Sequence, residues 1–152
     1  MLRGRELPVV PDLHTLNELV RCRPGLFLRQ SEGPEVDLLS PTSRDYESGV
    51  EMPGLSVTTI APEPWWPRPA IDWLARRICK YADLGLTEQR RPWLLQGRVV
   101  GRGPDHEPLV TDVQPVAWLD DTVIREARDR YQSCFDVGND SKNGHRRRRV
   151  AS

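Results

Sequence analysis

Three residues far apart in the sequence carry side chains that could act together on one ligand. Arg29 ends a short apolar segment that we expect to be a strand, Ser56 lies in a second strand-like segment, and Glu107 lies in the loop before a later one. A guanidinium holds anionic groups, and a carboxylate stabilises positive charge as it develops, so the two can serve opposite ends of one ligand. The sequence therefore predicts Arg29, Ser56 and Glu107 as catalytic candidates.

In that order and on those elements, Arg29, Ser56 and Glu107 distantly resemble the arginine, serine and glutamate of ADP-ribosyltransferase-type folds. The resemblance implies NAD as the cofactor. Arg29 would hold its pyrophosphate, Ser56 would brace the nicotinamide-ribose pocket, and Glu107 would stabilise the oxocarbenium-like transition state. The chain departs from the family where a serine-threonine-serine signature is reduced to 56–58, and where Asp105 replaces a second glutamate. A separation of more than about 12 Å between the three would exclude one ligand-sized pocket, and with it the enzyme.

Two polar segments are predicted to form the rest of any site. Residues 31–53 show no sustained period and predict a long loop without regular structure, and residues 101–108 predict the loop of a hairpin. Loops held by a rigid scaffold commonly carry binding residues. The first functional hypothesis is therefore a ligand- or partner-binding module, with the NAD-using enzyme as its alternative and no other cofactor evident. The ligand-binding candidates are Arg44, Asp45, Tyr46, Arg102, Asp105 and His106.

Other residues that could bind ligands or take part in catalysis are predicted to have structural roles only. The glycine-containing string 101–105 lies between two predicted strands and not before a helix, so it predicts a turn and not a phosphate-binding loop. Residues 105–107 are three metal-capable neighbours whose side chains point apart, so we expect no metal site. The cysteines are odd in number and widely spaced, which indicates reduced, buried thiols: Cys22, Cys79 and Cys134.

Trp65 and Trp66 lie between prolines in the segment 61–69, where a stiff backbone could present two indoles to a base, a sugar or a proline-rich peptide. Large aromatic side chains usually cover the core instead. We expect these two to cover one end of it.

The formal net charge of zero combines two unlike segments. Residues 137–152 hold five basic residues against one acid, so the rest of the chain is acidic. That segment has almost nothing apolar to bury and predicts a disordered basic tail. Its arginine run could contact the phosphates of nucleic acid weakly, although an acidic body would repel the same polyanion. The run consists of Arg146, Arg147, Arg148 and Arg149.

The elements that must position these residues are predicted to be short, because the chain is 38% hydrophobic and holds 14 prolines and 11 glycines. Apolar spacing predicts helices at about 12–22, 69–84 and 121–134. Strand-like runs lie at 26–29, 54–60, 93–100 and 109–119, and Pro115 places the last of them at an edge or a bulge. We therefore expect an α+β fold with a small, mostly antiparallel sheet, about three helices and long polar loops.

The length of 152 residues fits one domain, which we place at 12–136 between an N-terminal extension at 1–11 and the tail at 137–152. No apolar run approaches the roughly 20 residues of a membrane span, and the first residues lack the apolar stretch of a signal peptide. We expect no membrane association and a cytoplasmic location.

Four strings resemble a family of small actinobacterial proteins of unknown function: 44–49, 53–57, 64–66 and 101–109. The resemblance covers most of residues 12–130. It implies an actinobacterial lineage. The use of arginine for 20 of the 22 basic residues indicates a high-GC bacterial genome, or a phage of one, because arginine has GC-rich codons. It implies no activity.

Overall fold

The computed structural model describes residues 6–86 and 90–135. The predicted basic tail lies outside them. Within the described residues the chain forms an α+β fold of four helices and one six-stranded mixed sheet, which confirms the predicted class. No helix in this part of the chain is long and apolar enough to cross a membrane. In chain order the elements are β1 Val9–Val10, α1 Leu13–Cys22, β2 Phe27–Ser31, α2 Pro34–Leu39, β3 Leu55–Ser56, β4 Thr58–Thr59, α3 Ala70–Leu86, β5 Arg91–Arg102, β6 Pro108–Leu119 and α4 Asp121–Phe135.

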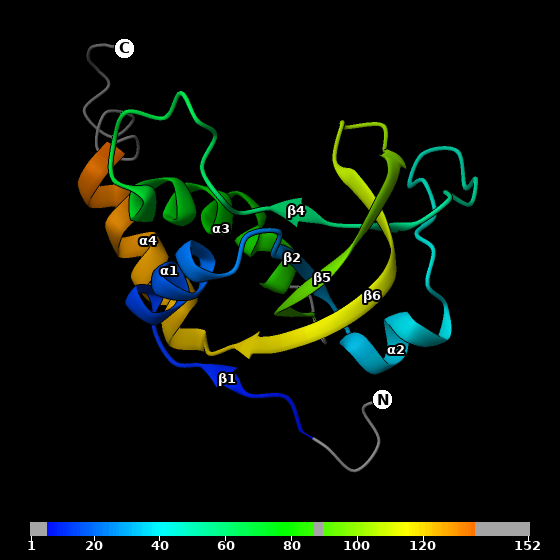
Figure 1. The fold of residues 1–152 in the computed structure, drawn as a ribbon, viewed down its shortest axis with the longest axis horizontal. Coiled ribbons are helices and arrows are strands. Elements are labelled where there is room, and N and C mark those ends of the chain that lie inside the picture. The colour runs from blue at the N-terminus through cyan, green and yellow to red at the C-terminus, as the bar shows by residue number, and fades with distance from the viewer. Residues whose placement is uncertain (1–5, 87–89, 136–152) are drawn as a thin grey trace.

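The sheet is built on the long antiparallel hairpin of β5 and β6 and curls back on itself. Its order is β1-β6-β5-β2-β4, and β3 pairs with β6. The short strands β3 and β4 are separated only by Val57, yet β3 pairs with β6 while β4 pairs with β2. Segment 55–59 therefore joins the two sides of the β2-β5-β6 sheet, and Figure 1 shows β5 and β6 bending around it. Among the strands that the structure describes, β1 alone runs parallel to its neighbour, β6.

Both faces of β5 are buried over residues 92–95, which explains the continuous apolar run there. Leu94 of β5 packs in a core with α1, α3 and α4, whereas its neighbours Trp93 and Leu95 point into a second core inside the curl. In Figure 1 these three helices gather at one end of the molecule and α2 lies toward the other. The inner core is completed by Phe27, Leu55, Val57 and Val110.

Most elements follow the predictions from spacing. Asp12 caps α1, because its Oδ1 accepts the backbone N–H of Thr15 at 2.8 Å. Pro115 lies where the register of β5 against β6 shifts, opposite Leu95, so the predicted bulge is confirmed. The predicted strand at 54–60 is instead two short strands, since the segment changes partner at Val57.

The prediction of a structureless loop over 31–53 is wrong. Residues 34–39 form α2, and Arg44 bridges Glu51 in a small hairpin. The sequence of α2 shows no apolar stripe on its buried side. Leu39 is 87% exposed, and the charged residue Asp37 is buried instead. A fourth helix is the result. The expectation of buried cysteines is wrong for Cys22, which is exposed; all three thiols are free.

Candidate functional site

Arg29, Ser56 and Glu107 form one hydrogen-bonded chain although 27 and 51 residues separate them in sequence. Nη1 of Arg29 donates to the backbone oxygen of Ser56 at 2.8 Å, and Oγ of Ser56 donates to Oε2 of Glu107 at 3.1 Å. The three line a cavity of about 170 Å³ that Asp105 also lines. Their separation is far below the limit of about 12 Å for sharing one ligand-sized pocket.

Arg29 is held by a carboxylate that the sequence did not point to. Its Nε donates to Oδ2 of Asp37 at 2.7 Å and its Nη2 to Oδ1 at 3.3 Å. Both side chains are largely buried, so this two-point ion pair is well shielded from water. Each nitrogen of the guanidinium therefore already donates to a protein acceptor, and Asp37 balances its charge.

The same carboxylate ties α2 to the inner core. Oγ of Ser31 donates to Asp37 at 2.6 Å and accepts from Nε1 of the fully buried Trp93 at 2.9 Å. Ser31 also accepts the backbone N–H of Gly33 at the start of α2. One signal in the sequence could have revealed this network. An arginine inside a buried strand requires an acid nearby, and Asp37 is within reach along the chain.

Glu107 is fixed by the turn that precedes β6. The backbone closes through Gly103 N–H to the oxygen of Glu107 at 2.8 Å, with His106 in the left-handed region at φ 64°. The carboxylate folds back over the turn, where its Oε1 accepts the backbone N–H of Asp105 at 2.9 Å. A Cβ at position 103 would collide with this carboxylate, so glycine is required for the close approach.

A wider open hollow of about 460 Å³ adjoins the cavity and shares Arg29, Ser56, Asp105 and Glu107 with it. Its other wall comes from the hairpin at 43–54. Oγ of Ser43 accepts the backbone N–H of Ser56 at 2.9 Å, which fixes this hairpin against β3. We call the cavity and the hollow together the acidic cleft; its lining includes Val36, Asp37, Ser43, Arg44, Asp45, Tyr46 and Met52.

The acidic cleft keeps a net negative charge once Arg29 and Asp37 are paired. Arg44 and Arg90 then remain against Asp45, Asp105 and Glu107, which leaves one negative charge in excess. The hydroxyl of Ser48 donates to Asp45 and lowers the pKa of that carboxyl, so Asp45 stays ionised at neutral pH. Among the described residues, no group of three or more His, Cys, Asp or Glu could hold a metal.

Two of the predicted ligand-binding residues lie apart from the others. Arg102 donates from Nη1 to the backbone oxygen of His106 at 3.2 Å, and neither residue lines the acidic cleft. Both brace the turn that carries Glu107. Arg44, Asp45, Tyr46 and Asp105 do line the cleft.

Comparison with known proteins gives the chain a family and no activity. The chain matches the family model of DUF6098, a family of unknown function, over residues 3–144, and it belongs to that family. No curated protein and no solved structure matches it.

Proposed function

We propose that this member of DUF6098 is a partner-binding module whose acidic cleft receives a basic side chain of a protein partner. The observation that carries the proposal is the position of Glu107. Its carboxylate is fixed by Ser56 and by the backbone of Asp105 at the mouth of a preformed cavity. A carboxylate that needs no reorganisation is a ready acceptor for an ammonium or guanidinium group.

The charge of the acidic cleft supports a cationic group. Each oxygen of Glu107 accepts one protein hydrogen bond, and a carboxylate offers about four acceptor positions, so capacity remains for a ligand. Asp105 lines the same cavity and adds a second negative charge, while Arg90 in the same wall donates from Nη1 to the backbone oxygen of Gln30 at 3.2 Å. The cavity volume of about 170 Å³ suits one side chain rather than a whole cofactor.

The apolar rim supports a protein as the source of that side chain. Val36 and Met52 line the hollow together with Tyr46, which is fully exposed. Leu39 at the end of α2 is also largely in solvent. Exposed apolar residues beside polar ones mark protein contact surfaces, and tyrosine is a frequent anchor in them.

Nuclear magnetic resonance titration with N-acetyl-arginine amide tests this proposal. We expect saturable shifts of the backbone signals of Ser56, Asp105 and Glu107 at millimolar probe, and none with the uncharged isostere N-acetyl-citrulline amide. Glu107→Gln should abolish the shifts because it removes the charge and keeps the shape. Asp112→Asn is the matched control, since Asp112 is an exposed acid paired with Arg98 outside the cleft. Equal shifts with both probes would refute the proposal.

An NAD-using enzyme is the second candidate, and the contact between Arg29, Ser56 and Glu107 favours it. The ion pair with Asp37 weighs against it, because a pyrophosphate would have to compete with a buried carboxylate for Arg29. Thermal stabilisation by NAD and slow hydrolysis of NAD, both lost in Glu107→Gln, would establish the enzyme. Their absence in the wild-type chain would discard it.

Three sequence predictions remain to be tested on the full chain. If the arginine run 146–149 contacts nucleic acid, the full chain should bind a single-stranded oligonucleotide in a salt-dependent way. Deletion of 137–152 should abolish that binding. We also propose a cytoplasmic location and an actinobacterial lineage.

A further inference from the structure

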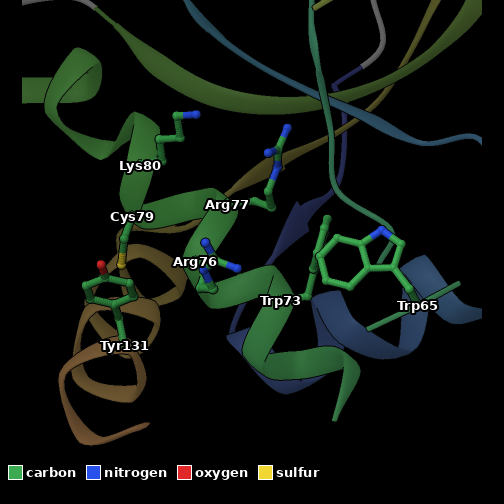
Figure 2. Close-up of a pocket in the computed structure, with 7 residues that line it drawn as sticks. All are labelled: Trp65, Trp73, Arg76, Arg77, Cys79, Lys80 and Tyr131. Carbon is green, nitrogen blue, oxygen red and sulfur yellow. The ribbon is translucent and has the colours of Figure 1, made fainter. Parts of the chain in front are cut away.

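A second cavity, of about 500 Å³, lies along the outward side of α3 and shares no residue with the acidic cleft. Figure 2 shows Trp65 and Trp73 toward one end of it and Tyr131 toward the other, with Arg76 between them. The tryptophans come from the proline-rich segment before α3 and from its first turn, and Tyr131 comes from α4. We call it the α3 cavity. Its volume falls within the range of sites for small molecules.

The indoles provide an exposed stacking surface. Trp65 packs edge-on against Trp73, with ring centroids 5.6 Å apart and an interplanar angle of 77°. Trp66 packs edge-on against the same ring at 5.1 Å. Trp73 is buried by these contacts, but Trp65 is still 68% exposed, so the expectation that both neighbours cover the core does not hold for Trp65. An indole held by its edge leaves its face for another planar ring.

Positive charge lines the same cavity. Arg76, Arg77 and Lys80 contribute to its wall, and the lining residues that the structure describes include no carboxylate. Arg77 is fixed in place because its Nε donates to the backbone oxygen of Thr59 at 3.0 Å. Arg76 lies over the rings of Trp66 and Phe135, and within the described part of the chain its contacts are of this cation–π kind alone. The N–H donors of Arg76 therefore remain for an anion.

One buried donor in the wall also points to an absent acceptor. Nε1 of Trp73 is buried and has no hydrogen-bond partner in the part of the chain that the structure describes. Such groups are rare in folded proteins, because leaving a buried donor unsatisfied is unfavourable. The unsatisfied group belongs to a ring that lines the α3 cavity.

We propose that the α3 cavity binds a ligand in which an aromatic base is joined to a phosphate. The base stacks on Trp65, and the phosphate accepts hydrogen bonds from Arg76 in the positive field of Arg77 and Lys80. We expect neither the base alone nor the phosphate alone to bind as tightly as the joined ligand, since the cavity combines an aromatic end with a cationic wall. The ligand is either a free nucleotide or a unit of single-stranded nucleic acid.

Calorimetric titration of the full chain with AMP tests the site, with adenosine and inorganic phosphate as the two half-ligands. We expect AMP to bind at least about tenfold more tightly than either half. Arg76→Gln and Trp65→Leu should each weaken AMP binding by about tenfold, and both positions are exposed enough for the fold to persist. Arg98→Gln is the matched control, because Arg98 is an exposed arginine on β5. The indole N–H signal of Trp65 should shift on titration.

A short oligodeoxyadenylate distinguishes the two sources. The ligand is single-stranded nucleic acid if the oligonucleotide binds more tightly than AMP. That binding should be lost in Arg76→Gln and kept when residues 146–149 are changed to glutamine. AMP binding without a gain from the oligonucleotide assigns a free nucleotide. NAD stabilisation lost in Arg76→Gln but kept in Glu107→Gln would place that dinucleotide here and not in the acidic cleft.

Three outcomes would overturn the proposal. They are no binding of AMP or the oligonucleotide at millimolar concentration, binding that neither Arg76→Gln nor Trp65→Leu weakens, and binding of phosphate as tight as that of AMP. Thermal denaturation of each variant separates loss of the site from loss of the fold.

Discussion

Oγ of Ser56 donates a hydrogen bond to Oε2 of Glu107 at 3.1 Å, which joins the end of β3 to the turn before β6. The backbone oxygen of the same serine accepts from Arg29, so one residue connects the buried ion pair to the half-buried carboxylate of Glu107. The position of Glu107 therefore depends on the curl of the sheet, because β3 reaches Glu107 only where it pairs with β6. A change that displaces Glu107 without unfolding the sheet tests the site more cleanly than its removal.

Gly103→Ala is such a change. The added Cβ would meet the Glu107 carboxylate, which is the end of a flexible side chain and can swing away from Ser56. We expect N-acetyl-arginine amide to bind about tenfold more weakly in nuclear magnetic resonance titration. The free energy of unfolding should fall by less than about 1 kcal/mol.

The matched control is Gly101→Ala, since a Cβ there would meet only Leu109 and Pro53 at ordinary van der Waals distances of 3.9 and 4.0 Å. It should leave the binding of N-acetyl-arginine amide unchanged. A Gly103→Ala variant that binds like the wild type would show that the precise position of the carboxylate is unimportant.

Asp37→Asn should be strongly destabilising. The amide keeps the size of the carboxylate but leaves the largely buried guanidinium of Arg29 without a counter-charge, which costs about 3–5 kcal/mol in comparable sites. Urea denaturation measures the loss. Asp112→Asn breaks an exposed pair with Arg98 and should cost less than about 1 kcal/mol. Similar losses for both variants would mean that the Arg29–Asp37 pair is not shielded.

The sequence predicted the long elements well because each carries a local pattern. Apolar residues at helical spacing and the cap at Asp12 place the helices, and apolar runs on both sides of the 103–107 turn place β5 and β6. The helix α2 was not predicted, because a buried acid anchors it to the core and its leucine and valine side chains are exposed. The closure of the sheet was not predicted either, since the change of pairing strand at Val57, from β6 to β2, leaves no local signal in the sequence.

The sequence predicted which three residues converge but not all that surrounds them. Arg29, Ser56 and Glu107 were identified by type and order, and they are in contact. The neutralisation of Arg29 by Asp37 was not predicted, because the helix that turns Asp37 inward shows no apolar stripe. The α3 cavity was visible only as an ambiguous pair of tryptophans, because its cations lie on the side of α3 away from the core.

Gly54→Ala should weaken the closure of the sheet. A Cβ at this position would lie 2.8 Å from the backbone oxygen of Val110 and 2.9 Å from its nitrogen, and the backbone of β6 cannot rotate away as a side chain can. We expect a loss of about 1–3 kcal/mol in urea denaturation, as for overpacked cores. Gly101→Ala is again the control, and an unchanged midpoint in Gly54→Ala would show that segment 55–59 can shift along β6.

Asp12 should make the stability of the chain depend on acid pH. The backbone N–H of Thr15 lowers the pKa of this carboxyl below its ordinary value of 3.8 by hydrogen bonding to the charged form. A lowered pKa in the folded state stabilises the protein above the unfolded pKa, and the benefit disappears as pH falls through the folded pKa. Asp12→Asn still caps the helix but does not titrate. The difference in melting temperature between the two chains should therefore be constant above about pH 5 and should change as pH falls below about 4.

Cys79 provides a chemical readout of the α3 cavity, which it lines. Burial raises the pKa of this thiol above its usual 9.0 by disfavouring the thiolate, so less of the reactive form exists at neutral pH. In a Cys134→Ser background, we expect iodoacetamide to modify Cys79 several-fold more slowly than the exposed Cys22, by mass spectrometry of the peptides. AMP should slow the reaction of Cys79 further and leave Cys22 unaffected, because only Cys79 lies in the cavity. Equal protection of both thiols would indicate general stabilisation and not occupancy of the α3 cavity.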